Sequence, residues 1–160
     1  MQVENLMSKE VQCVAPEDSL EYAAQLMWDH DCGCLPVCSP KDGAERRTIG
    51  VLTDRDVCMN ALFEGKPLRD LRVSAAMTKE VHACQPSDTL AQAERVMRNA
   101  RVRRIPVLGD GQTLIGMISL ADLACQAARE HGGTSQEITE TEIGDTLAAI
   151  CERPSQPLHA

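Results

Sequence analysis

The amino-acid sequence predicts an α+β fold in which one plan, a helix, a β-hairpin and a second helix, occurs twice. The first observation is an internal repeat, since many residues recur in the second half at a constant offset of 70. The second is the spacing of apolar residues, which in each half changes from a helical period to two short runs joined by a turn-rich segment. The third is another helical pattern near the C-terminus, which predicts a short C-terminal helix.

The composition favours a folded acidic protein and argues against nucleic-acid binding. The 160 residues are 43% hydrophobic with a formal net charge of -8, so a core can form but a basic face for phosphates is not expected. The aromatic residues are Tyr22, Trp28 and Phe63, too few for a base-stacking platform. Without an export signal or a membrane-spanning stretch, we expect a cytoplasmic protein whose eight cysteines are free thiols.

The repeat keeps its register along both copies. Met7-Ser8 recurs as Met77-Thr78. After the first strand the offset falls to 66, which places four additional residues of the first copy in the polar segment 39–48, where added length costs little. Further pairs at offset 70 are Pro16 and Pro86, Asp18 and Asp88, Leu20 and Leu90, Ala23 and Ala93, Met27 and Met97, Pro36 and Pro106, and Val37 and Val107. The pairs at offset 66 are Gly50 and Gly116, Thr53 and Ser119, and Asp56 and Asp122.

In the first copy the order of elements follows from caps and apolar spacing. Asp18, with an acidic residue three positions later, predicts the start of a helix. Residues 35–38 and 49–52 are short apolar runs on either side of a polar loop, as in an antiparallel hairpin. Thr53 predicts the cap of a second helix, which Gly65 ends. The apolar face of the first helix consists of Leu20, Ala23, Ala24 and Met27.

The second copy repeats this order. Asp88 predicts the cap of its first helix, and residues 105–108 and 114–118 predict the two strands. Ser119 predicts the cap of a helix that ends near residues 131–133.

A third helix is expected after the second copy. Thr139 and Glu142 form another capping signal, and Pro154 is expected to stop the helix. Its apolar stripe consists of Ile143, Leu147, Ile150 and Cys151. The predicted domain organisation is therefore a first repeat over 1–68, a second over 69–132, and a C-terminal helical extension and tail over 133–160.

The repeated plan resembles the CBS-domain family over residues 1–131. The motifs are Met-Ser/Thr at the start, Leu/Ile-Pro-Val in the first strand and Gly-x-x-Thr/Ser-x-x-Asp after the second. The resemblance implies a tandem pair, or Bateman module, whose copies pack through their sheets around a pseudo-twofold axis. It implies two related clefts that hold adenosine-containing ligands such as AMP, ADP or ATP. Many modules of the family also form flat homodimers through their helices, for which the LAxxM faces and the C-terminal helix offer apolar surface.

A hydroxyl and a carboxylate at the start of the second helix of each copy are the main candidate ligand residues. The Thr53 hydroxyl and the unpaired amides of the helix it begins favour a phosphate, and Asp56 can accept from both hydroxyls of a ribose. Ser119 and Asp122 repeat the arrangement, and the resemblance assigns these positions to phosphate and ribose. The same residues also form an ordinary helix cap, so capping alone remains an alternative.

Arginines lie beside the candidate site of the second copy only. Arg101, Arg103 and Arg104 precede its first strand, where the first copy has no arginine. Arg103 and Arg104 are predicted phosphate ligands, and the resemblance gives Arg104 that role in some family members. A solvated face or an intersubunit salt bridge is the alternative for these arginines. The remaining candidate pocket residues, equally plausible as core, are Met7, Met77, Thr78, Val14, Leu35, Pro36, Ile105 and Pro106.

The cysteines and histidines do not predict a catalytic or metal site. Cys32, Cys34 and Cys38 lie close together with His30 nearby, but a second spaced pair of ligands is missing and strand alternation directs Cys34 and Cys38 to one buried face. His82 and His131 lack a neighbouring acid and nucleophile in sequence. The other cysteines, expected as small core residues, are Cys13, Cys58, Cys84, Cys125 and Cys151.

We therefore expect a regulatory module and not an enzyme. An adenosyl ligand would bind between the repeats, shift their packing and alter the affinity of a homodimer or of a separate protein target. Neither a catalytic cofactor nor a nucleic-acid or membrane partner is expected. One alternative is a constitutive protein-interaction module with vestigial clefts, and a further one is a thiol or metal sensor built on the cysteines of segment 32–38.

Overall fold

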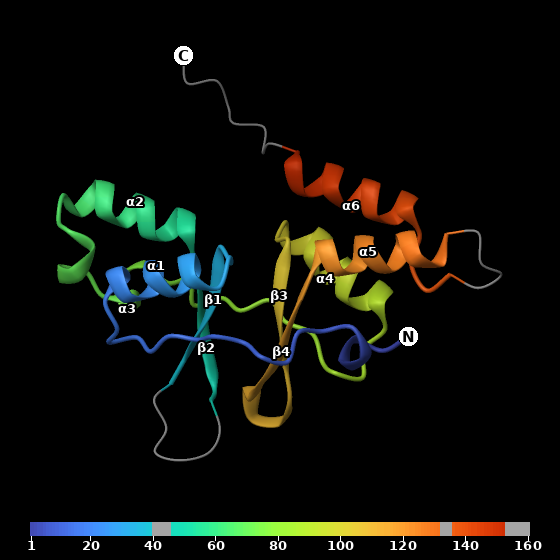
Figure 1. Cartoon of the computed structure of the whole chain (residues 1–160), viewed down its shortest axis with the longest axis horizontal. Helices are drawn as coiled ribbons and strands as arrows, with labels where there is room; N and C mark the ends of the chain where they lie inside the picture. Colours follow the sequence, from blue (N-terminus) through green and yellow to red (C-terminus); the bar gives the residue numbers. More distant parts are fainter. Residues whose placement is uncertain (40–45, 132–135, 153–160) are drawn as a thin grey trace. The chain divides into compact units, whose positions relative to one another are not determined.

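The computed structural model describes residues 1–39, 46–131 and 136–152. Both repeats contain a helix, a two-stranded hairpin and a second helix, and an additional helix follows them (Figure 1). The first repeat consists of α1 (Leu20–Asp29), β1 (Cys34–Cys38), β2 (Thr48–Thr53) and α2 (Asp54–Glu64). The second consists of α4 (Leu90–Ala100), β3 (Arg104–Leu108), β4 (Leu114–Ser119) and α5 (Leu120–Glu130). The remaining helices are α3 (Val73–Ala76), α6 (Glu140–Cys151) and the 3-10 helices Val3–Asn5, Leu68–Asp70 and Asp110–Gln112.

These elements confirm the predicted α+β class, the duplicated hairpin-and-helix plan and the short C-terminal helix. The predicted hairpins agree with β1 and β2 and with β3 and β4, and Thr53 and Ser119 are the N-caps of α2 and α5 as expected. Gly65 ends α2 in the left-handed conformation, with φ of 62°, which glycine adopts without a steric penalty. The predicted insertion lies between β1 and β2, and its residues 40–45 fall outside the described part of the chain.

The first hairpin is extended on both sides by single bridges. β1 and β2 are antiparallel, Val14 forms a parallel bridge to Val37 of β1, and Thr78 forms an antiparallel bridge to Val51 of β2. The Val51 and Thr78 amides each donate to the carbonyl of the other residue at 2.9 Å. The segments before α1 and after α3 are thereby held against the hairpin by main-chain hydrogen bonds.

The motif glycine Gly50 is required by this close approach. A Cβ atom at position 50 would lie 2.9 Å from the Thr78 carbonyl oxygen and 3.1 Å from the Met77 sulfur. Both distances are shorter than ordinary van der Waals contact, and the first involves backbone that cannot swing away. The glycine of the Gly-x-x-Thr-x-x-Asp motif therefore serves packing, whereas the threonine and aspartate after it form the helix cap.

The chain forms two compact units. The first-repeat unit comprises Ser8–Val81 and Leu108–Gly116, and the second-repeat unit comprises Met1–Met7, His82–Val107 and Met117–Ala160.

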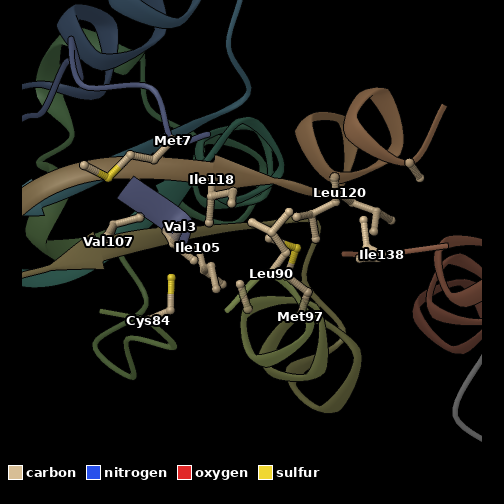
Figure 2. Packing of buried hydrophobic residues seen from close by; sticks show 13 residues of the cluster. Val3, Met7, Cys84, Leu90, Met97, Ile105, Val107, Ile118, Leu120 and Ile138 are labelled. Carbon is tan, nitrogen blue, oxygen red and sulfur yellow. The ribbon is translucent and has the colours of Figure 1, made fainter. Parts of the chain in front are cut away.

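The methionine of each Met-Ser/Thr motif lies in the predicted range of one repeat but packs in the core of the other. Met7 is 8% exposed and belongs to the core that also contains Ile105 and Ile118 of the second repeat (Figure 2). Met77 packs against the core that contains Leu35 and Leu52 of the first repeat. The domain limits drawn from the sequence remain a prediction, but the two cores are built from exchanged N-terminal segments.

Two predicted helix caps are wrong by one residue. Ser19 is the N-cap of α1 and Thr89 is the N-cap of α4. Asp18 and Asp88 instead each accept a hydrogen bond, 2.7 Å long, from the amide three residues earlier in the preceding turn. Asp, Ser and Thr are all good caps, so adjacent candidates are separated only by the backbone geometry of the turn.

The apolar stripe predicted for α6 is only partly buried. Thr139 and Glu142 form the expected capping box, and Ile143 and Ile150 pack against the second core. Leu147, however, is 44% exposed. Cys151 is also exposed, and Pro154 lies outside the described residues. The helix contacts α4 and α5, as Figure 1 shows.

On α6 the buried residue is Thr146 and not Leu147, and it makes a polar contact. Thr146 is fully buried, and its hydroxyl donates to a carboxylate oxygen of Glu94 on α4. The Arg98 Nε donates to Thr146 Oγ1 at 3.1 Å, and an Arg98 Nη2 pairs with Glu94 Oε1 at 2.9 Å. Burial raises the pKa of the Glu94 carboxyl, while the positive charge of Arg98 opposes that rise. Hydrogen bonds as well as apolar contacts therefore attach α6 to α4.

The LAxxM faces, which were expected to support dimerisation, are not exposed. The LAxxM faces of α1 and α4 are buried in the cores of their own units, so they cannot contact a partner. The exposed large side chains of the first repeat lie on α1 and α2 instead: Tyr22 is 50% exposed, Trp28 83%, Leu62 69% and Phe63 78%. No helix within the described ranges is long and apolar enough to cross a membrane.

Candidate functional site

The first candidate site lies where β2 passes into α2. Thr53 is the last residue of the strand and the N-cap of the helix. Its main-chain amide and its hydroxyl both donate to Asp56 Oδ2, at 2.9 and 2.7 Å, and the Asp56 amide returns a bond of 3.2 Å to Thr53 Oγ1. The two predicted ligand residues are thus brought together, and they form a capping box.

The second candidate site repeats this geometry where β4 passes into α5. The Ser119 amide and hydroxyl donate to Asp122 Oδ2 at 2.8 and 2.6 Å, and the Asp122 amide donates to Ser119 Oγ at 3.2 Å. Both carboxylates are used through one oxygen, Oδ2. The capping alternative raised by the sequence therefore describes a real contact in both copies, and ligand binding has to coexist with it.

A second main-chain contact ties each cap to the first strand of its own hairpin. The Gly33 carbonyl accepts from the Asp54 amide at 3.2 Å, and the Arg103 carbonyl accepts from the Leu120 amide at 2.9 Å. Asp54 and Leu120 are the first residues of α2 and α5. The residue just before each first strand is therefore adjacent to the helix N-terminus, where the dipole favours an anion.

This contact makes the two sites electrostatically unequal. Arg103 lies beside the N-terminus of α5, with Arg104 at the next position, and both side chains are exposed, whereas the first repeat has Gly33 and Cys34 in these places. Arg101 instead ends α4 and donates to the Glu152 carbonyl at 3.4 Å. Of the three arginines, Arg103 and Arg104 are thus placed next to a candidate site.

The apolar candidates are mostly core residues. Pro36 and Pro106 are buried in their strands, whereas Met77 is partly exposed and Thr78 exposed. Val14, Leu35 and Met77 belong with the Thr53 site in the first-repeat unit, and Ile105 and Met7 belong with the Ser119 site in the second-repeat unit. Val14, Leu35 and Ile105 are also buried, at 2%, 1% and 0% exposure. Their assignment to a ligand pocket remains a prediction.

Three cysteines are not in the predicted environment. Cys58, Cys125 and Cys151 are exposed, although the sequence suggested core positions, because a small apolar residue on a helix does not by itself reveal which face it occupies. Within residues 1–39, 46–131 and 136–152, no three His, Cys, Asp or Glu side chains are grouped so that they could hold a metal ion.

One pair of thiols escaped the sequence analysis. Cys13 and Cys38 lie in hydrogen-bond contact, whereas the cluster considered from sequence was Cys32, Cys34 and Cys38. The available signal was indirect: the offset of 70 relates Val14, which follows Cys13, to Cys84. Each of these two residues forms a bridge to the first strand of its repeat. A parallel bridge between distant segments gives no local pattern that a sequence reading could detect.

These features, a duplicated hairpin-and-helix unit with a capped Gly-x-x-Thr/Ser-x-x-Asp turn, define a module of two tandem repeats. Residues 3–61 and 69–126 each match the family model described as the CBS domain. The chain belongs to the CBS-domain family, and the resemblance noted from its sequence motifs is confirmed.

Similar proteins include stand-alone CBS-domain proteins. The CBS domain-containing protein YhcV of Bacillus subtilis is 31% identical over 134 residues, covering 83% of this chain and 91% of YhcV. Hypoxic response protein 1 of Mycobacterium tuberculosis is 31% identical over 147 residues, covering 92% of each chain.

Solved structures share the fold. A structure of Hypoxic Response Protein I with two coordinated zinc ions has a TM-score of 0.69 and 30% identity, covering 78% of this chain and 98% of that one. The structure of CBSX2 in complex with AMP has a TM-score of 0.67 at 23% identity, covering 81% of this chain and 98% of CBSX2, and shows likeness of fold alone.

Proposed function

We propose that the chain is a regulatory module that binds an adenosine-containing ligand. The observation that carries the proposal is the duplicated turn in which a hydroxyl residue and an aspartate begin a helix next to the end of a strand, at Thr53 and Asp56 and again at Ser119 and Asp122. The helix dipole favours a phosphate at the N-terminus, and a carboxylate one turn later can accept from ribose hydroxyls. The amides expected to be unpaired at the start of α2 are already used, because those of Asp54, Arg55 and Asp56 donate within the chain. The dipole, and not free amides, would therefore attract a phosphate at the Thr53 site. The AMP complex of CBSX2 supports the choice of ligand class, since that protein has the same fold.

The proposed binding mode keeps the capping boxes intact. Asp122 uses Oδ2 for Ser119, so its Oδ1 is the oxygen that would accept from a ribose. Arg103 and Arg104, exposed beside the N-terminus of α5, would pair with a phosphate through charge-assisted hydrogen bonds. The Ser119 site is therefore expected to bind phosphorylated adenosine more tightly than the Thr53 site, which has no arginine at the matching positions.

Regulation would follow from a difference in ligand affinity between two packing states of the repeats. The output would be a change in self-association or in binding to a separate protein target, with no catalytic step performed by this chain. A homodimer would use the exposed aromatic side chains of α1 and α2 in place of the buried LAxxM faces. Sedimentation of the protein with and without ligand would measure that output.

The binding test is a thermal shift and calorimetry series on protein freed of copurified small molecules. AMP, ADP, ATP, S-adenosylmethionine and NADH are compared with adenosine alone. A true ligand raises the unfolding midpoint progressively with concentration, because it binds the folded state. Failure of every adenosine compound to raise the midpoint would contradict the proposal.

Matched variants separate binding from capping. Asp122→Asn keeps an acceptor for Ser119 but removes the charge, and we expect binding to weaken about 10- to 100-fold, as for loss of a hydrogen bond to a charged group. Glu142→Gln makes the same kind of change in the capping box of α6, which contains none of the proposed ligand residues, and should leave affinity unchanged. Arg104→Gln should weaken AMP binding but not adenosine binding.

The rival function is a constitutive protein-interaction module. It predicts that Asp56→Asn and Asp122→Asn alter stability through their caps while binding to any protein partner stays the same. Absence of AMP binding by the wild type, together with unchanged partner binding by both variants, would favour this rival, whereas equal AMP affinity of wild type and Asp122→Asn would remove Asp122 from the binding site.

A further inference from the structure

The thiols of Cys13 and Cys38 are brought together by a bridge between segments distant in sequence. The Val14 amide donates to the Pro36 carbonyl at 3.1 Å, and the Cys38 amide donates to the Val14 carbonyl at 2.9 Å. Cys13 and Cys38 flank this parallel contact, and their side chains form a hydrogen bond. These two main-chain bonds of Val14 hold the segment before α1 against β1, which keeps the two thiols near each other.

The two thiols have different surroundings. Cys13 is half-buried and Cys38 is 4% exposed. The buried hydroxyl of Thr48, the cross-strand partner of Cys38, lies beside the Cys38 thiol. The guanidinium of Arg46 lies near both sulfurs. One thiol is thus reachable from solvent beside a positive charge, and the other is enclosed behind it.

This arrangement divides the roles of the two sulfurs. The hydrogen bond donated by Cys38, aided by the charge of Arg46, lowers the pKa of the Cys13 thiol to about 6, although burial and Asp18 oppose the change. Donation to Cys13, together with burial, raises the pKa of Cys38. Near neutral pH, Cys13 is a thiolate and a nucleophile, while Cys38 keeps its proton.

We propose that Cys13 and Cys38 form an oxidation-sensitive dithiol, in which Cys13 reacts with a hydroperoxide and Cys38 then closes an intramolecular disulfide. The proposal is independent of nucleotide binding. It differs from the thiol sensor considered from the sequence, because Cys32 and Cys34 take no part and the partner of Cys38 comes from the segment before α1.

The reaction with hydrogen peroxide is balanced in two steps. The Cys13 thiolate attacks one peroxide oxygen, the S–O bond forms, the O–O bond breaks, and the hydroxide that leaves takes a proton from solvent to give water. Cys38 sulfur then attacks the sulfur of the Cys13 sulfenic acid, the S–S bond forms, the S–O bond breaks, and the departing hydroxide takes the Cys38 proton. Two thiols are oxidised by two electrons in total and one peroxide is reduced to two waters.

The second repeat offers an internal comparison. Cys84 bridges Val107 in the same parallel manner that Val14 bridges Val37, but the positions that match Cys13 and Cys38 hold Ala83 and Leu108. Burial raises the pKa of Cys84 to about 12. Cys84 is therefore expected to be inert, and the reactive pair is confined to the first repeat.

The first experiment treats the reduced full-length protein with one equivalent of hydrogen peroxide. We expect two of the eight thiols to be lost, a monomer mass lower by about 2 Da for a disulfide, and a peptide map that joins Cys13 to Cys38. Cys13→Ser should abolish the crosslink, whereas Cys58→Ser, which removes an exposed thiol on α2, should leave it intact. A map that joins other cysteines, or that finds only intermolecular disulfides, would overturn the proposal.

The second experiment measures alkylation of each cysteine by iodoacetamide as a function of pH. The rate at Cys13 should be half-maximal near pH 6, and at that pH it should exceed the rate at exposed Cys58 about tenfold, since a larger thiolate fraction outweighs lower nucleophilicity. Cys38→Ala should move the Cys13 profile to higher pH, because the donor is lost. A wild-type Cys13 profile that matches that of Cys58 would refute the division of roles, and this readout does not depend on a Cys38 variant folding.

Discussion

The two repeats share their caps and differ in what surrounds them. Thr53 with Asp56 and Ser119 with Asp122 have the same three hydrogen bonds, within 0.1 Å of each other in length. The first repeat holds a thiol pair at the end of its hairpin away from the cap, whereas the second has two exposed arginines beside its cap and is contacted by α6. The capping residues, which are also proposed ligand residues, match in the two copies, whereas the thiol pair and the arginines beside the cap each occur in one copy.

Coverage by α6 is the largest difference in packing. The second core includes Ile138, and Ile143 and Ile150 pack against it, whereas α1 and α2 leave Trp28 and Phe63 mostly exposed. In the first repeat α1 and α2 are contacted by the short helices Leu68–Asp70 and α3, whereas in the second α4 and α5 are both contacted by the longer helix α6. Three predictions test how far this contrast extends.

The largest expected effect is loss of a core leucine at matched positions. Leu20 and Leu90 are both fully buried, and replacement of either by alanine should lower the free energy of unfolding by about 2–5 kcal/mol. The loss should be greater for Leu90→Ala, because helices held by α6 collapse less readily into the cavity. Urea unfolding of the two variants measures the difference, and an equal or larger loss for Leu20→Ala would show that α6 does not stiffen the second core.

An intermediate effect is expected at the contact that attaches α6. Thr146→Val keeps the shape of the side chain but removes the hydroxyl that joins Glu94 and Arg98, so the free energy of unfolding should fall by about 1–3 kcal/mol. Thr141→Val, at an exposed position of the same helix, is the control and should change it by less than about 0.5 kcal/mol. Equal effects at the two positions would mean that the polar contact adds nothing to docking.

The smallest expected effect is a pH dependence that originates from Glu94. Burial raises the pKa of this carboxyl in the folded protein above its ordinary value of 4.5, so the folded state binds more protons than the unfolded state above that pH. Stability should therefore fall as pH rises through the window above about 4.5, with a slope of at most about 1.4 kcal/mol per pH unit. Urea unfolding from pH 4 to 8 should show this fall in wild type relative to Glu94→Gln. A constant difference between the two proteins would remove Glu94 as its source.

Local patterns in the sequence were sufficient for the two hairpins, the longer helices and most caps, but not for α3 or the 3-10 helices. The offset of 70 gave the duplication, and the hydroxyl residues Thr53, Ser119 and Thr139 cap helices where expected. Asp18 and Asp88 were misassigned because Ser19 and Thr89 are equally good caps, and only the turn geometry distinguishes neighbours.

Contacts between distant segments could not be predicted in the same way. The burial of Thr146 depends on Glu94 and Arg98, which lie on a different helix. The approach of Cys13 to Cys38 depends on a parallel bridge with no hairpin turn to announce it. At the candidate site the sequence correctly paired each hydroxyl with its carboxylate, but it could not show that Arg103 is held against the N-terminus of α5 by its own carbonyl.

The exchange of methionines between the two cores limits how the chain can be divided. A fragment that ends at residue 68 would contain Met7 without the core in which Met7 is buried, and would lack Met77 and the Thr78 bridge to β2. A fragment that begins there would lack Val3 and Met7, both of which are buried in its core. Neither half, expressed alone, would contain a complete hydrophobic core, so each repeat needs the other on the same polypeptide in order to fold.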